Sequence, residues 1–245
     1  MSEEIELKLL REIENLKKEI KELKGEKKNI PSYSFSKIKD KDLRDLFCIE
    51  RIIHREIFNT WFNCSIILNI EDETFLQALI ESESDLINRY NEEELKIYFL
   101  APILNRVNFK NKTKKMRAFY EESLEYETED FKLSGSIDFF VSKGLDYPEK
   151  PYFFIQEFKR DKEYSNPEPQ LLAELIVASE LNSFELLKGA YIIGENWTFV
   201  ILRRLAKHKY EYFISEKYNS CKIEELKVIY RNLLFVKKEI EDLLS

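Results

Sequence analysis

The chain has 245 residues, of which 44% are hydrophobic and 35% charged, with a net charge of −7. These values are typical of globular proteins, and with 5 Gly and 6 Pro they exclude collagen-like and low-complexity chains. No apolar run approaches the roughly 18 residues of a membrane span, and the acidic, amphipathic start is unlike a signal peptide, so we expect a cytoplasmic protein outside the membrane. The odd number of scattered cysteines favours free thiols over disulfides or a zinc site: Cys48, Cys64 and Cys221.

A coiled-coil helix is predicted over residues 1–29, because apolar residues follow a 4-3-4-3 spacing. They are Leu9, Ile13, Leu16, Ile20 and Leu23. We expect this helix either to pair two copies into a homodimer or to pack on another helix of the same chain. Gly25 and Pro31 close it, residues 30–40 read as a linker, and a second domain is expected over 41–245.

Three helices are expected next, over 41–62, 72–90 and from Asn91 onward. Asn91 is a predicted N-cap, with Glu94 as its capping-box partner. Glu92 lies on the apolar face of this third helix, either as a first-turn acid that complements the helix dipole or as a site residue.

Alternating, aromatic-rich sequence from 118 to 158 predicts two or three strands, the last running from 152 to 159. An amphipathic helix follows at 168–182, then a hairpin centred on 194–196 and a long helix at 222–244. This order predicts an α+β fold, or an α/β fold with a mixed sheet.

The chemically informative residues are acids inside apolar strands. Asp138 interrupts the apolar strand around 137–141, and Glu157 and Lys159 end the strand YFFIQEFK with both side chains on one face. If the two strands are neighbours, their carboxylates converge, and such a group suits a hard divalent cation such as Mg²⁺ beside an ammonium. The alternative is a buried salt-bridge cluster, because an isolated buried carboxylate is costly. The spacing alone leaves both readings open.

Several segments, in this order, resemble the PD-(D/E)XK nuclease superfamily, and more narrowly an uncharacterised bacterial subgroup of it. They are GSID at 135–138, QEFK at 156–159 and PQLLAE at 169–174, with the helix EEELKIYFLAPILNRV before them and the hairpin GAYIIGENWTFVIL after them. The resemblance covers about 90–205 and continues to the C-terminus. Ile137 stands where the motif's name has proline.

This resemblance implies a restriction-endonuclease-like mixed sheet flanked by helices and metal-dependent hydrolysis of phosphodiester bonds, most of all in DNA. Asp138 and Glu157 would hold Mg²⁺ or Mn²⁺ together with the carbonyl of Phe158. Lys159 would orient the attacking water and stabilise the developing charge. Glu92 matches an outer acidic ligand, and Gln170 a polar residue of the site.

Basic residues suggest where nucleic acid would bind, despite the acidic net charge. The candidates are Lys110, Lys112, Lys114, Lys115, Arg117 and Arg160. A dimer formed by the N-terminal helix would set two sites against the two strands of a duplex. The alternative function is a nuclease-like module that no longer cuts, and instead dimerises and binds a partner. The same acidic charge and coiled coil favour it.

Overall fold

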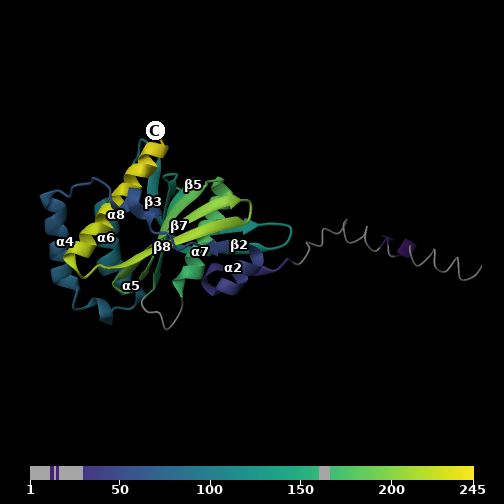
Figure 1. Cartoon of the computed structure of the whole chain (residues 1–245), viewed down its shortest axis with the longest axis horizontal. Coiled ribbons are helices and arrows are strands. Elements are labelled where there is room, and N and C mark those ends of the chain that lie inside the picture. Colours follow the sequence, from purple (N-terminus) through teal and green to yellow (C-terminus); the bar gives the residue numbers. More distant parts are fainter. Residues whose placement is uncertain (1–11, 14, 17–29, 160–165) are drawn as a thin grey trace, which may run out of the picture.

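The computed structural model describes residues 12–13, 15–16, 30–159 and 166–245. Within these residues the chain forms one mixed, curled eight-stranded sheet with helices on both faces (Figure 1). The strand order is β1-β4-β5-β6-β7-β8-β2, and β3 pairs with the other edge of β4. The strands are β1 (Ser32–Ser34), β2 (Cys48–Arg51), β3 (Met116–Glu127), β4 (Lys132–Lys143), β5 (Glu149–Lys159), β6 (Leu186–Ile193), β7 (Asn196–Ala206) and β8 (Lys209–Asn219).

The helices divide between the two faces of the sheet, so that each face has its own hydrophobic core. The α-helices are α2 (Asp40–Leu46), α3 (Asn59–Phe62), α4 (Ile70–Glu83), α5 (Glu92–Leu95), α6 (Ala101–Val107), α7 (Pro167–Asn182) and α8 (Ile223–Leu243). Helices α3 to α6 and α8 cover one face, while α2 and α7 cover the other (Figure 1). The α+β or mixed-sheet α/β class is therefore confirmed.

Helix α7 is enclosed by the curled sheet. An unbroken run of its residues from Pro169 to Ser179 is buried, and α7 contacts β3 to β7 as well as α2. Its buried residues lie on all sides of the helix and include the polar Gln170 and Glu174. The prediction of an amphipathic helix with an exposed face was wrong here, although its position was right.

The neighbourhood of β4 and β5 is decisive for the site. Along one edge, β4 pairs first with β1, up to Ser134, and later with β5, from Phe139 onward. The two strands β4 and β5 are antiparallel neighbours, with Phe139 opposite Gln156. They separate just before Phe139, and β5 continues alone alongside β6 to Lys159. Asp138 therefore stands at a fork in the sheet.

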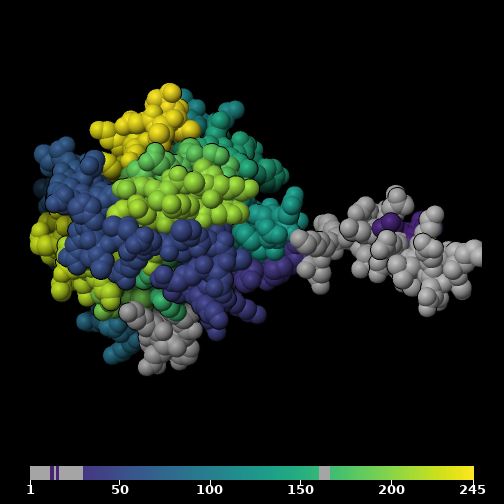
Figure 2. Space-filling view, turned by 45° about the vertical axis from the view of Figure 1, so that its right-hand side comes forward, coloured from purple at the N-terminus to yellow at the C-terminus, as the bar shows by residue number. Residues whose placement is uncertain are grey.

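The single helix expected over 41–62 is wrong, because this segment holds α2, β2 and α3 in succession. Its apolar residues follow helical spacing, but Cys48–Arg51 is recruited as a strand by pairing in parallel with β8. Figure 2 shows this blue segment lying beside the yellow-green residues of β7 and β8. Pairing with a distant strand is a tertiary effect that local periodicity does not report.

The linker expected over 30–40 is also wrong. Residues Ser32–Ser34 form β1, which pairs with β4, and a 3₁₀ turn follows at Phe35–Lys37. The Phe35 ring is fully buried against Gly135, where even an added methyl carbon would come within 2.8 Å of it. This part of the chain belongs to the folded domain.

Other predictions are confirmed with small shifts. The Asn91 capping box is present, and the helix that it opens reaches Val107 through a π-helical turn at Lys96–Leu100. The hairpin around 194–196 is β6–β7, and the C-terminal helix is α8. None of the described helices is both long and apolar enough to cross a bilayer.

The coiled-coil prediction for residues 1–29 lies almost wholly outside the described residues. Of its seam, Ile13 and Leu16 are described, in helical conformation, and they are 46% and 51% exposed.

Replacing Phe35 by alanine should lower the free energy of unfolding by about 3–5 kcal/mol, because the ring fills a closed core position. Urea unfolding of Phe35→Ala measures this, with the exposed Lys37→Ala as the matched control. A change under about 0.5 kcal/mol in Phe35→Ala would mean that the segment is a linker after all.

Candidate functional site

Asp138 is held at the fork by two donors. Its Oδ2 accepts a hydrogen bond from the Phe158 backbone N–H at 2.7 Å, and its Oδ1 accepts one from Lys96 Nζ at 2.9 Å. The Phe158 N–H would otherwise face the gap left where β4 and β5 separate. The carboxylate thus satisfies a backbone donor that the sheet cannot, which explains how an acid is kept in an apolar strand at 8% exposure.

Glu157 follows on β5 and is fully buried. One oxygen, Oε1, is paired with Lys159 Nζ, as expected for two side chains on one face of a strand. The other, Oε2, has no hydrogen-bond partner among the described residues. Burial and the charge of Asp138 raise the pKa of Glu157 to about 8, against the opposing pull of Lys159. A proton or a cation bound at Glu157 would reduce the repulsion between its carboxylate and that of Asp138.

Two lysines neutralise part of the cluster. Lys96 Nζ lies 2.9 Å from Glu121 Oε1 as well as from Asp138, and 3.6 and 3.7 Å from Glu92 and Glu93. Burial alone would lower the pKa of Lys96, but hydrogen bonds and charges of Glu121 and Asp138 outweigh it and raise the pKa.

Lys159 also bridges two elements. Its Nζ lies 3.9 Å from Glu92 Oε1 at the start of α5 in addition to its pair with Glu157. Burial opposes the charged form, but the charge and hydrogen bond of Glu157 prevail and raise the pKa of Lys159.

Helix α7 closes the site from the other face. Gln170 Nε2 donates to Glu174 Oε1 at 3.1 Å, so this amide reaches the cluster through a second acid. Glu174 is fully buried, and its Oε2 has no partner among the described residues. Burial and the charges of Glu157 and Asp138 raise the pKa of Glu174 well above its ordinary value.

The cluster is strongly acidic. Six carboxylates face two lysines, Lys96 and Lys159. The acids are Glu92, Glu93, Glu121, Asp138, Glu157 and Glu174. Only Asp138, Glu157 and Glu174 are buried, whereas the side chains of Glu92, Glu93 and Glu121 are 37%, 74% and 57% exposed. The charge of the three buried acids must be reduced by the lysines, by bound protons or by an added cation.

The structure brings together most of the residues predicted for the site. Asp138, Glu157, Lys159 and Glu92 form one network, and Gln170 joins it through Glu174. The contribution of Phe158 that the structure shows is its N–H on Asp138.

Sequence reasoning missed Lys96, Glu121 and Glu174. Two of them carried a signal. Lys96 is four residues after Glu92 on the same helix. Glu174 is an acid within the apolar run 171–178, where burial without a role is costly. Glu121 had none, because its part in the site depends on the shape of β3.

The basic cluster at 110–117 is not beside this network. Met116 pairs with Lys143, five residues along β4 from Asp138 and hence roughly 17 Å away. Lys114 instead contacts Ser245 Oγ and the Glu241 carbonyl at the C-terminal end of α8.

Arg117 and Arg160 also belong to the set predicted to bind nucleic acid. The Arg117 guanidinium donates to the Leu145 carbonyl at 2.7 Å and stacks on the Phe119 ring, so it braces the β4–β5 loop. Arg160 lies outside the described residues.

As the side chains stand, the part of the chain that the structure describes holds no group of three His, Cys, Asp or Glu side chains arranged to bind one metal ion. The carboxylates of the network instead point at Lys96 and Lys159. Mg²⁺, however, commonly binds through one or two carboxylates, with water and substrate oxygens completing its shell. The Asp138–Glu157 pair, in which one buried oxygen has no partner in the described ranges, is compatible with that mode.

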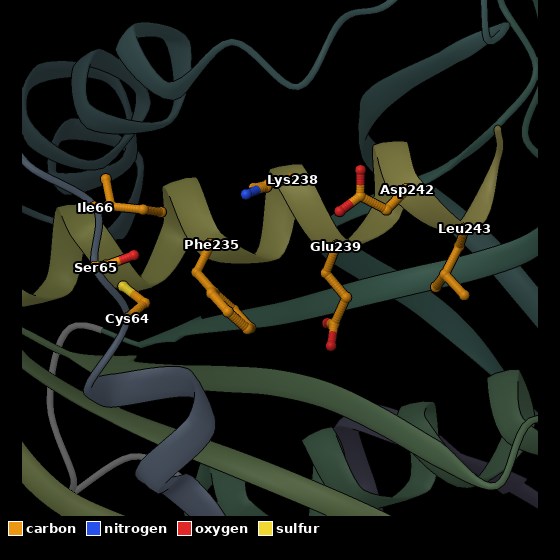
Figure 3. Close-up of a pocket in the computed structure, with 8 residues that line it drawn as sticks. All are labelled: Cys64, Ser65, Ile66, Phe235, Lys238, Glu239, Asp242 and Leu243. Atoms are coloured by element: carbon orange, nitrogen blue, oxygen red, sulfur yellow. The ribbon is translucent and has the colours of Figure 1, made fainter.

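A separate groove of about 490 Å³ lies between segment 64–66 and the C-terminal half of α8 (Figure 3). Its lining includes Phe235, Lys238, Glu239 and Asp242, of which Glu239 is already ion-paired with Lys188 at 2.5 Å. None of the residues predicted for the site lines it.

Comparison with known proteins adds no assignment: no family model matches the chain, and no curated protein matches it significantly. The resemblance to PD-(D/E)XK nucleases therefore stays a prediction from its motifs.

Removing the charge of Glu157 should change how stability depends on pH. The pKa of this carboxyl is about 8 in the folded protein and 4.5 ordinarily, so the folded state binds more protons between these values. The free energy of unfolding of the wild type should therefore fall as pH rises through this window. Relative to the wild type, Glu157→Gln should gain stability across it, by on the order of 4 kcal/mol.

Chemical unfolding at a series of pH values measures the difference. Glu129→Gln, which changes an exposed glutamate, is the control and should follow the wild-type curve. Parallel curves for Glu157→Gln and the wild type would show that Glu157 is ionised throughout and that the buried pair is fully compensated.

Proposed function

We propose that the protein is a divalent-cation-dependent nuclease that hydrolyses phosphodiester bonds, most of all in DNA, on a restriction-endonuclease-like fold. One observation carries the proposal: at a fork between neighbouring strands, Asp138 lies near a buried Glu157 with Lys159 beside it, and one Glu157 oxygen has no partner within the part of the chain that the structure describes. An unsatisfied buried carboxylate oxygen costs free energy, and a bound proton or cation would offset that cost.

Asp138 and Glu157 are the proposed ligands of Mg²⁺ or Mn²⁺, with the Phe158 carbonyl as a third and Glu92 as an outer one. Oxygen donors of this kind suit hard cations, and a positive charge here would offset the excess of carboxylates. When bound, the cation would polarise the phosphoryl group and lower the pKa of a coordinated water.

Lys159 is proposed to donate to the attacking water or to a phosphoryl oxygen. Its ammonium is only partly buried, so it can turn from Glu157 toward a bound phosphate. Gln170 is proposed to hold Glu174 in place from α7, since its amide donates to that carboxylate.

Phosphate contacts away from the reacting group are proposed for the basic residues predicted above. Lys110, Lys112 and Lys115 are exposed and available. Their distance from Asp138 suits contacts several nucleotides along a strand.

Cleavage assays on plasmid, linear duplex, single-stranded DNA and RNA, with Mg²⁺ and with Mn²⁺, test the proposal. We expect metal-dependent cleavage that falls at least about 100-fold in Asp138→Asn, which removes a metal ligand, and in Lys159→Gln, which removes the charge that stabilises the transition state. Glu129→Gln is the control, and circular dichroism establishes that each variant is folded. The proposal would be contradicted by a folded wild type that cuts none of these substrates and whose melting temperature does not change when Mg²⁺ or Mn²⁺ is added.

A second function has its own support. The ammonium groups of Lys96 and Lys159 already pair with the carboxylates, so these acids have cationic partners without a metal. The other groups of the cluster are acids, which do not attract nucleic acid. A nuclease-like module that binds a partner without cutting would have this character. The cleavage and metal-binding experiments separate the two functions.

We also propose a homodimer formed by the predicted N-terminal coiled coil. Its support is the seam spacing, together with the exposure of the two described seam residues, Ile13 and Leu16. Sedimentation equilibrium should give twice the chain mass for the wild type and for the off-seam control Asn15→Lys. The double variant Ile13→Glu with Leu16→Glu should be monomeric. A wild-type monomer, or a double variant that still dimerises, would contradict this interface.

A further inference from the structure

Lys96 lies close to several carboxylates, whereas an ordinary salt bridge joins one lysine to one acid. Its ammonium lies within 4 Å of four carboxylates, two of them at 2.9 Å, and its side chain is 14% exposed. The four acids come from α5, β3 and β4, so three separate elements direct their charges to one point. Four carboxylates are more than the three hydrogen bonds that an ammonium can donate, so more negative charge gathers here than one lysine compensates.

Two backbone irregularities, each of which usually costs free energy, occur at the residues that form this contact. Lys96 begins a π-helical turn, a rare irregularity that shifts the side chains after it on the helix. Glu121 has a φ of 53°, a left-handed conformation that is strained in residues other than glycine, asparagine and aspartate. The π-helical turn lies at the Lys96 end of the Lys96–Glu121 hydrogen bond, and the left-handed residue is its other end.

The same ammonium also orients Asp138. With Oδ2 held by the Phe158 N–H and Oδ1 held by Lys96, this carboxylate has no freedom to rotate. Lone pairs remain on both oxygens for a further ligand, because each oxygen accepts only one of these bonds.

From these contacts we propose that Lys96 is a positioning residue whose ammonium takes the place of a second divalent cation. The site would accordingly bind one ion, on the Glu157 side of Asp138, while Lys96 supplies a fixed positive charge on the other side. This inference rests on the proposed metal-dependent function, and it names which part of the acidic cluster the metal does not occupy.

A neutral side chain at position 96 should open that second position. We expect the wild type to bind one Mn²⁺ per chain in isothermal titration calorimetry, and Lys96→Gln to bind two. Lys96→Arg keeps the charge and should bind one. Lys132→Gln is the matched control, because Lys132 is another sheet lysine between two glutamates, Glu125 and Glu127, and it should also bind one.

Lys96→Met is a second neutral variant, which keeps the aliphatic stem packed if glutamine destabilises the fold. Circular dichroism establishes folding before each titration. One ion in both the wild type and the folded neutral variants would overturn the inference and leave the proposed function intact. No ion in the wild type but one in the neutral variants would overturn the metal-dependent function of the native chain and retain Lys96 as the occupant of a cation position. No ion in any of them would overturn both.

Discussion

The hydrogen bond from the Phe158 N–H to Asp138, at the point where β4 leaves β5, determines the arrangement of the other charged side chains. A strand that parts from its neighbour exposes backbone donors inside the protein, and these must be satisfied. A carboxylate does this well, since hydrogen bonds to a charged acceptor are strong. The charge itself must then be compensated, and Lys96 approaches from the helical layer to do so. Placing one acid at the fork thus requires a cation, and that cation in turn gathers further acids.

The second constraint is the enclosure of α7. Because the sheet curls around this helix, Glu174 has no route to solvent and must face Glu157 from within the core. The buried acids of the cluster, Asp138, Glu157 and Glu174, therefore lie in the interior, and α7 covers them on one side of the sheet. Rigid support of this kind is what a site needs if it is to hold charges close together against their repulsion.

Much of the site could be predicted from the sequence, because its signals are local. Asp138 and Glu157 stood out as acids in apolar strands, and Lys159 followed from the two-residue period of a strand. Glu174 was visible in the same way but was read as part of an amphipathic helix, since the periodicity of α7 does not reveal how completely a curled sheet encloses it. The fold class followed from the order of helical and alternating segments.

What could not be predicted depends on contacts between distant segments. Strand β2 exists because it pairs with β8, and the segment at Ser32–Ser34 becomes a strand because β4 offers it an edge. The acid pairing of Lys96 depends on a π-helical turn and on the left-handed Glu121, and neither has a sequence signature. The basic cluster at 110–117 was expected near the cleft from its place in the chain, but the antiparallel course of β3 carries it away.

The enclosure of α7 also has a consequence for the dynamics of the protein. A surface helix can exchange its amide hydrogens with solvent by fraying or by lifting from its sheet, at a cost well below that of complete unfolding. Helix α7 has no such route, because it is packed between the curled sheet and the segment that holds α2, and it is buried over nearly its whole length. Its amides should exchange only when the whole sheet opens, and in hydrogen–deuterium exchange α7 would be the last helix to take up label. The short helix α5, which carries Glu92 and precedes Lys96, would do so earlier.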